Sequence, residues 1–225
     1  MLAVLAPLPD TFAATRDAVH VLACYAVAPA RKARTGHISL RPTASGIGTP
    51  PFDDGSDVSI DGATLHRGTK WTPVTTLRAA AQFLGIELLA DPGVGRDLPP
   101  FRPDDELAID PAAAEALAGW YRFGHGVLAA INAPDVSEAQ LWPEHFDLAA
   151  VVTVASGARA NVGFSPGDGY SAAPYVYVGP FSLDGIAGPY WNAPFGATLS
   201  YADVAAAGDP AEAVQAFIAE GLERL

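Results

Sequence analysis

The chain has 225 residues, half of them hydrophobic, and a formal net charge of -12 at pH 7. This apolar content excludes an intrinsically disordered chain, because burying so much apolar surface offsets the entropy lost on folding. The charge is uneven, since residues 1–102 hold ten basic and nine acidic residues whereas residues 103–225 hold three and sixteen. We expect no nucleic-acid binding, because an acidic half repels phosphate backbones.

A single cysteine, Cys24, rules out an internal disulfide. It lies in an apolar helical pattern and is predicted to be a buried small hydrophobe. His20, beside the apolar face of the same helix, is predicted to be a satisfied core or boundary histidine. The apolar start, Met1–Leu8, is too short to span a bilayer and lacks a basic leading segment. We therefore expect a cytoplasmic protein without a membrane partner, and the oligomeric state is left open.

Four stretches are predicted to be helices, because a capping residue precedes each and apolar residues recur on one face. Asp10 and Thr11 precede the first and Thr75 the second, while Asp110 and Asp209 precede the others with proline following. The predicted helices cover residues 12–33, 76–84, 111–132 and 210–225, the first two closed by Gly36 and Gly85.

Alternating or continuous apolar runs predict the strands. The predicted strands cover residues 37–43, continuing through 44–49 after a glycine kink, and 58–60, 63–65, 146–154, 159–164 and 174–178. Asp61-Gly62 is the strongest hairpin signal. Both faces of residues 146–154 are apolar, as in a central strand covered on both sides. Residues 90–105, rich in proline, glycine and charge, are predicted to be a surface loop.

These elements predict an α+β fold, in which antiparallel sheets built from hairpins are backed by three or four helices. We expect one α+β domain over residues 1–225, with halves 1–105 and 106–225 sharing one core as the finer division. Each half ends its β region in a Gly/Pro-rich segment, residues 46–52 and 163–167, which raises the hypothesis of a loose internal duplication. Chance recurrence in a chain with 22 glycines and 20 prolines is the alternative.

The densest polar cluster is Glu144-His145-Phe146-Asp147. In a strand, His145 and Asp147 would point to the same face and Glu144 to the other. An aspartate fixes the tautomer of a neighbouring imidazole and raises its pKa, so His145 and Asp147 are the candidate catalytic residues. Two ligands do not make a metal site. The alternative is that both residues satisfy backbone groups at the strand end.

Aromatic residues are dense in the C-terminal half, and Tyr175 and Tyr177 share one face of a predicted strand. Aromatic walls with a few polar groups are typical of small-molecule pockets, although packing of a sheet against helices uses the same residues. We expect an aromatic-lined cleft near His145. The predicted ligand-binding residues are Trp142, Glu144, His145, Asp147, Tyr175, Tyr177 and Trp191.

The segment from Gly163 to Gly167 matches the Gly-x-Ser-x-Gly string of serine hydrolases. Pro166 removes the backbone amide that would build an oxyanion hole, and a strand follows rather than a helix, so a hairpin loop is the preferred interpretation. The dinucleotide, Walker, His-Glu-x-x-His and Cys-x-x-Cys motifs do not occur. We predict neither a cofactor nor a metal.

Three segments carry a resemblance: LWPEHFDLA (141–149), GFSPGD (163–168) and PYVYVGPF (174–181). They resemble an uncharacterised conserved actinobacterial protein family with no known activity, most clearly over residues 141–205. The resemblance implies a bacterial cytoplasmic origin and carries over no functional residue.

The leading hypothesis is a protein that binds a small molecule in the aromatic-lined cleft. The second is an enzyme in which Asp147 orients His145 as a general base. The third is a homo-oligomeric structural or interaction protein whose exposed aromatic strand pairs with a second copy. The ligand and the question of catalysis are left open by the sequence.

Overall fold

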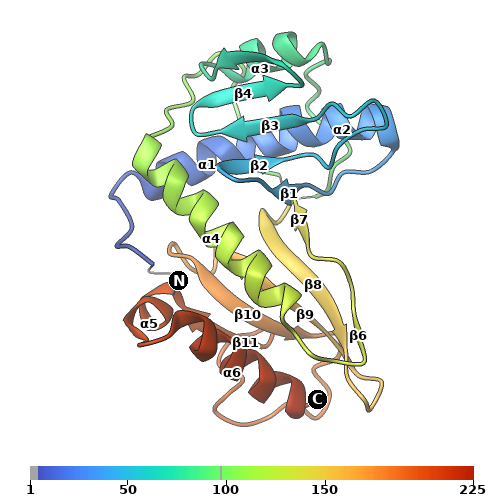
Figure 1. The fold of residues 1–225 in the computed structure, drawn as a ribbon, viewed down its shortest axis with the longest axis vertical. Helices are drawn as coiled ribbons and strands as arrows, with labels where there is room; N and C mark the ends of the chain where they lie inside the picture. The colour runs from blue at the N-terminus through green and yellow to red at the C-terminus, as the bar shows by residue number, and fades with distance from the viewer. Residues whose placement is uncertain (1–4, 97) are drawn as a thin grey trace. The chain divides into compact units, whose positions relative to one another are not determined.

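The computed structural model describes residues 5–96 and 98–225. It confirms the α+β prediction, with two antiparallel sheets and helices packed on them (Figure 1). Two predictions fall partly outside the described residues: the apolar start, through residues 1–4, and the loop over 90–105, through Asp97. Among the described residues, no helix is both long and apolar enough to cross a bilayer.

The chain divides into two compact units, and each is described by itself. Unit 1 contains residues 5–7, Trp120–Gln140 and Asp147–Leu225, and unit 2 contains Leu8–Gly119 and Leu141–Phe146. The expectation of one domain with a division at residue 105 stays a prediction.

The helices are α1 (Phe12–Leu22), α2 (Ala28–Thr35), α3 (Leu77–Leu84), α4 (Pro111–Ala129), α5 (Tyr201–Ala206) and α6 (Pro210–Glu223), with the π-helical turn η1 (Ala23–Val27) between the first two. The strands are β1 (Arg41–Pro42), β2 (Gly46–Gly48), β3 (Val58–Asp61), β4 (Thr64–Arg67), β5 (Lys70–Pro73), β6 (Asp135–Val136), β7 (Gln140–Trp142), β8 (Asp147–Thr153), β9 (Arg159–Ser165), β10 (Tyr175–Pro180) and β11 (Ala197–Ser200).

Unit 2 is built on a sheet in which consecutive strands pair antiparallel, in the order β1-β2-β3-β4-β5. The predicted hairpin is confirmed with its turn one residue later, since Asp61 pairs with Thr64 and the turn is Gly62-Ala63, in which Gly62 has φ 53°. This left-handed conformation suits glycine, which has no Cβ to clash. Strand β5 was not predicted, because Lys70–Pro73 is a largely exposed edge without an apolar face.

The predicted strand over residues 37–43 is mostly wrong, since only Arg41 and Pro42 belong to the sheet of unit 2. Their partner β2 ends at Gly48, opposite Arg41, so the ladder stops there. Leu40 instead forms a bridge with Leu141, the two residues exchanging hydrogen bonds of 2.7 and 2.9 Å.

The first helix begins and ends as predicted, with Gly36 at φ 77°, but it is not uniform. A π-helical turn over Ala23–Val27 separates α1 from α2. Pro29 in the first turn of α2 explains this, because proline cannot donate the i to i−4 hydrogen bond and its ring clashes with the preceding turn.

The predicted cap of α3 is one residue out. Thr76, not Thr75, has an extended backbone and accepts a hydrogen bond from the Ala79 amide at 3.1 Å. Asp110 and Asp209 cap α4 and α6 as predicted, with oxygens 2.9 Å from the amide of Ala113 and 3.0 Å from that of Ala211.

Unit 1 is built on a sheet with the order β11-β10-β9-β8-β6. The central strand β8 is buried over most of both faces, as predicted. On one face, the ring of Phe164 packs against Trp120 of α4, and α6 packs against β10 and β11 (Figure 1). Side chains alternate along a strand, so Gly163, Tyr175 and Tyr177 lie on the opposite face.

Candidate functional site

The seven predicted ligand-binding residues are divided between the two units. Trp142, Glu144 and His145 belong to unit 2, whereas Asp147, Tyr175, Tyr177 and Trp191 belong to unit 1. The boundary falls between Phe146 and Asp147, so each group is taken within its own unit.

The predicted strand over residues 146–154 is confirmed as β8, one residue shorter at each end, but the residues just before it are not extended. Strand β7 ends at Trp142 and β8 begins at Asp147, and the residues between them form a turn. Phe146 has φ 53°, and its amide donates to the Trp142 carbonyl at 2.7 Å. Strand alternation therefore does not apply to His145, which is exposed. The pairing of His145 with Asp147 on one strand face is therefore not supported, and the acid–base pair stays a hypothesis.

Within unit 2, one residue of α1 and one of η1 contact this turn at the same atom, the carbonyl oxygen of Pro143. His20 Nε2 lies 2.9 Å from the Pro143 oxygen, and the Cys24 thiol donates to the same oxygen at 3.1 Å. A carbonyl only accepts hydrogen bonds, so His20 carries its proton on Nε2. Its ring stacks on Phe146 with centroids 4.6 Å apart. The prediction of a satisfied boundary histidine is confirmed.

Burial keeps the His20 and Cys24 side chains uncharged. It lowers the pKa of His20 from 6.5 to about 4, against the opposing effect of the Pro143 hydrogen bond. Burial and the negative charge of Glu144 raise the pKa of Cys24 to about 12. The thiol is therefore neutral, as expected for a buried hydrophobe rather than a nucleophile.

The Glu144 side chain lies against the backbone at Gly95 of unit 2. A side chain at Gly95 would collide with the Glu144 side chain, since an added Cβ would lie 2.3 Å from the Glu144 Cβ. The Oε2 atom of Glu144 is buried and has no hydrogen-bond partner among the described residues. Trp142 is half-buried in β7.

Within unit 1, the structure brings Tyr177 to Asp147. Tyr177 on β10 pairs with Gly163 on β9, which pairs in turn with Ala149 on β8. A Cβ at Gly163 would lie 2.5 Å from the tyrosine ring, so the ring crosses the space that this glycine leaves open. The Tyr177 hydroxyl thereby reaches β8 and donates to Asp147 Oδ2.

Asp147 and Tyr177 are in a low-dielectric setting. Asp147 is only 7% exposed. Burial and the charge of Asp147 raise the pKa of Tyr177 well above its usual range, so the phenol stays protonated and acts as a donor.

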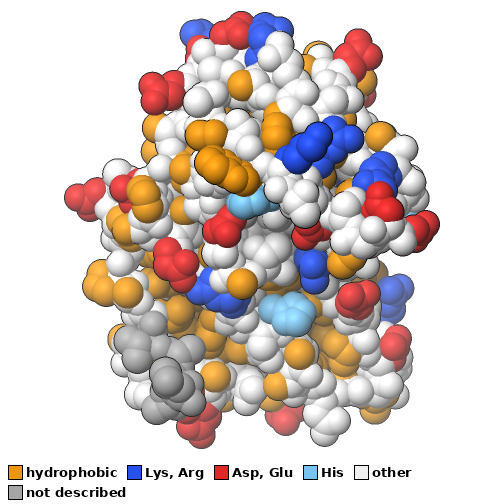
Figure 2. All heavy atoms as spheres, turned by 45° about the horizontal axis from the view of Figure 1, so that its top comes forward, with side chains coloured by type: hydrophobic (Ala, Val, Ile, Leu, Met, Phe, Trp, Pro, Cys, Tyr) orange, Lys and Arg blue, Asp and Glu red, His pale blue; other side chains and the backbone are white. Residues whose placement is uncertain are grey.

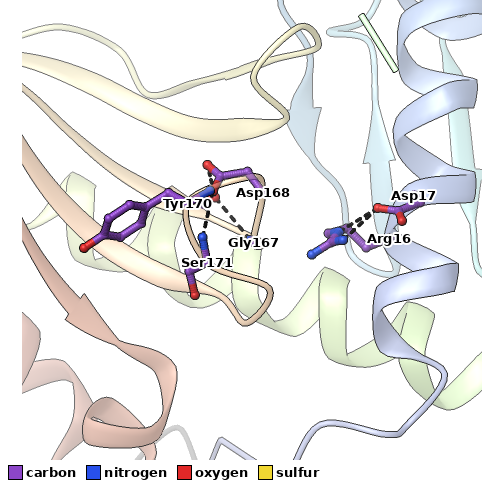
Figure 3. A network of polar contacts seen from close by, with 7 residues as sticks. Arg16, Asp17, Gly167, Asp168, Tyr170 and Ser171 are labelled. Carbon is purple, nitrogen blue, oxygen red and sulfur yellow. Dashed lines mark hydrogen bonds and ion pairs between the residues drawn. The ribbon is translucent and has the colours of Figure 1, made fainter. Parts of the chain in front are cut away.

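The neighbouring tyrosine makes a parallel contact. Tyr175 donates to Asp168 Oδ2 at 2.7 Å, and its pKa is raised by burial and by this hydrogen bond. Asp168 is itself fixed by its loop, because its Oδ1 accepts the amides of Tyr170 at 2.8 Å and Ser171 at 3.2 Å (Figure 3). Both carboxylate oxygens of Asp168 are thus oriented.

We call Asp147, Asp168, Tyr175 and Tyr177 the tyrosine–carboxylate wall. Phe195 borders it, with its ring centroid 6.3 Å from that of Tyr177 and 6.4 Å from that of Tyr175. Tyr170 packs edge-on against Tyr175 and Phe195. The sequence therefore identified three members of this wall.

Trp191 has different neighbours. Its ring packs against Tyr190 at 4.9 Å, and the Tyr190 hydroxyl donates to the Phe217 carbonyl of α6 at 2.7 Å. Within the described residues, the ring contacts of Tyr177 are with Tyr175 and Phe195. The structure thus does not bring Trp191 to the wall.

Asp168 is not among the predicted ligand-binding residues, because its segment was interpreted as a plain hairpin loop. That interpretation is correct for the backbone, since Ser165 ends β9, its hydroxyl accepts the Gly167 amide at 3.1 Å, and β10 follows. The available signal was the aspartate in a glycine-rich loop, where its side chain commonly accepts local amides.

Within the described part of the chain, no group of three or more His, Cys, Asp or Glu residues is arranged to hold a metal ion. Neither a protein-family model, nor a curated protein, nor a solved structure matches this chain.

Proposed function

We propose that the protein binds a small polar molecule at the tyrosine–carboxylate wall of unit 1. One observation supports this most: two tyrosines at alternate positions of β10 each donate to a carboxylate, Tyr177 to Asp147 and Tyr175 to Asp168. The proposal includes a cytoplasmic location, a relationship to the actinobacterial family and no nucleic-acid partner.

Packing alone does not require this arrangement. Burying a carboxylate costs free energy unless hydrogen bonds compensate it, and phenylalanines at positions 175 and 177 would fill much the same space beside Phe195. Oriented polar groups among aromatic rings are instead typical of ligand pockets. The wall lies on the sheet face opposite to the one on which Phe164 packs against α4.

The chemistry of the wall indicates the class of ligand. Its carboxylates only accept hydrogen bonds, and the faces of tyrosine rings attract cations. The hydroxyls stay protonated because the pKa values of Tyr175 and Tyr177 are raised. We infer a ligand with several N–H or O–H donors, such as a small amine or a sugar.

A panel of small amines, polyols and sugars tests this through the unfolding temperature. A ligand at a hundred times its dissociation constant stabilises by about 2.7 kcal/mol, which raises the unfolding temperature by roughly 5–10 °C for a chain of this size. We expect at least one compound to do so. Tyr177→Phe keeps the ring over Gly163 and removes the hydroxyl that contacts Asp147, so the shift should be largely lost.

The matched control is Tyr190→Phe, which removes a hydroxyl bonded to the Phe217 carbonyl instead. Each variant is compared with its own ligand-free unfolding temperature, because removing a buried hydrogen bond itself costs about 1–3 kcal/mol. Equal shifts in Tyr177→Phe and wild type would reject the wall as the binding site, as would a panel without a single stabilising compound.

A further inference from the structure

Unit 2 contains an open hollow of about 830 Å³, and none of its lining residues belongs to the wall. It is formed by the turn before β3, the β4–β5 turn and the end of α3, with Ser56, Thr69 and Phe83 among its lining residues. Figure 2 shows Lys and Arg side chains beside Asp and Glu side chains on the upper part of the face it draws. We call this hollow the basic hollow, because three basic and two acidic residues line it.

One cation and one carboxylate of the basic hollow neutralise each other. Arg34 Nη2 lies 2.8 Å from Asp54 Oδ2, and Arg34 Nη1 donates to Ser56 Oγ at 3.0 Å. Hydrogen bonds from Ser56 and from Arg34 hold the pKa of Asp54 well below its usual range. The remaining charged residues are Arg67, Lys70 and Asp57, which leaves a net charge of about +1.

Arg67 and Lys70 face each other directly across the β4–β5 hairpin. Like charges opposite each other in adjacent strands repel and destabilise a hairpin. Arg67 has a structural role, since its Nη1 donates to the Leu84 carbonyl at the end of α3 at 2.9 Å. That contact uses one of five guanidinium N–H donors, and it does not account for Lys70, which is exposed.

We propose that the basic hollow binds a phosphate group between Arg67 and Lys70, as the free ion or as the phosphoryl group of a small metabolite. A dianion between the two side chains converts their repulsion into two charge-assisted contacts. Arginine and lysine side chains commonly bind phosphate in proteins. The hydroxyl of Thr69 adds a donor on the turn between them, and Phe83 gives an organic ligand an apolar surface.

Titration of the full chain with inorganic phosphate, followed by amide NMR at constant ionic strength, tests this proposal. Saturable shifts are expected for Gly68 and Thr69. Lys70→Gln should weaken the apparent affinity by about tenfold, as loss of one charge-assisted contact implies. Arg96→Gln removes an exposed positive charge outside the basic hollow and should leave the affinity unchanged.

Phenyl phosphate provides a second arm of the experiment. Tighter binding than inorganic phosphate identifies a phosphomonoester as the natural class of ligand, and equal binding identifies the free ion.

Non-saturable shifts in the wild type, or equal weakening in Lys70→Gln and Arg96→Gln, would overturn the proposal. Lys70 is the primary test, since Arg67→Gln also removes the contact with Leu84. Tyr177→Phe should leave phosphate binding intact, so the two proposals fail separately.

Discussion

Replacing Phe164 by alanine is expected to lower the free energy of unfolding of unit 1 by about 3–5 kcal/mol. Phe164 is fully buried on β9, and its ring lies against Trp120 at 5.3 Å and Phe123 at 5.9 Å. Gly124 approaches so closely that an added Cβ would lie 2.6 Å from the Phe164 ring. Truncation leaves a cavity that the helix backbone cannot fill without moving.

Urea unfolding followed by tryptophan fluorescence measures this change, since Trp120 contacts the ring directly. The control is Phe181→Ala, which truncates the same residue type at a position that is 54% exposed and stacked on Arg159. Its cost should stay below about 1 kcal/mol. Similar losses in the two variants would show that Phe164 is not packed between β9 and α4.

Protonation of His20 is expected to lower the free energy of unfolding of unit 2 by about 3 kcal/mol as the pH falls from 6.5 towards 4. Its pKa in the folded chain is about 4, below the ordinary 6.5, because the imidazole is buried. The unfolded chain therefore binds the proton more readily over this range. The stability that the neutral His20 contributes is fully present above pH 6.5, and it is lost as the pH falls through the folded-state pKa of about 4. Asp17 raises this pKa and Arg16 lowers it, and the two form an ion pair with a 2.8 Å separation (Figure 3).

Urea unfolding at several pH values, compared between wild type and His20→Gln, isolates this contribution. Glutamine can still donate to the Pro143 carbonyl but does not titrate. The variant should lose clearly less stability than the wild type between pH 6.5 and 4.5. His37→Gln, at an exposed position, should follow the wild type. A slope in His20→Gln as steep as that of the wild type would contradict the buried neutral imidazole.

The predictions that succeeded depend on local chemistry. Gly62 allowed the hairpin turn, Gly36 ended the first helix and Asp209 capped the last one, because each residue satisfies a conformational or hydrogen-bonding need of its own segment. Regular alternation along β10 also put Tyr175 and Tyr177 on one face, and their rings lie 6.2 Å apart.

The predictions that failed depend on partners distant in sequence. The length of β1 is set by where β2 ends at Gly48. Phe146 adopts φ 53°, which is unfavourable for a residue with a Cβ, and it is held by stacking on His20. That single conformation removes His145 from the strand, and no pattern within residues 141–149 indicates it.

The candidate site was predicted only in part, because it also depends on contacts between segments distant in sequence. Asp147 and the two tyrosines were identified from composition and alternation, but their convergence depends on Gly163, whose missing side chain lets Tyr177 cross β9. Asp168 joins through loop contacts with Tyr170 and Ser171 that alternation does not describe. Register between strands, rather than residue type, creates this arrangement.

Selective ¹³C labelling of the seven tyrosine rings tests the tyrosine–carboxylate wall most directly. The compound that stabilises the chain most is titrated in, and each ring resonance is assigned by a Tyr→Phe variant. Tyr175 and Tyr177 should shift together and saturate at the dissociation constant found by thermal unfolding, while Tyr190 on the α6 side stays unchanged. Saturable binding that leaves both β10 tyrosines unmoved would contradict binding at the wall.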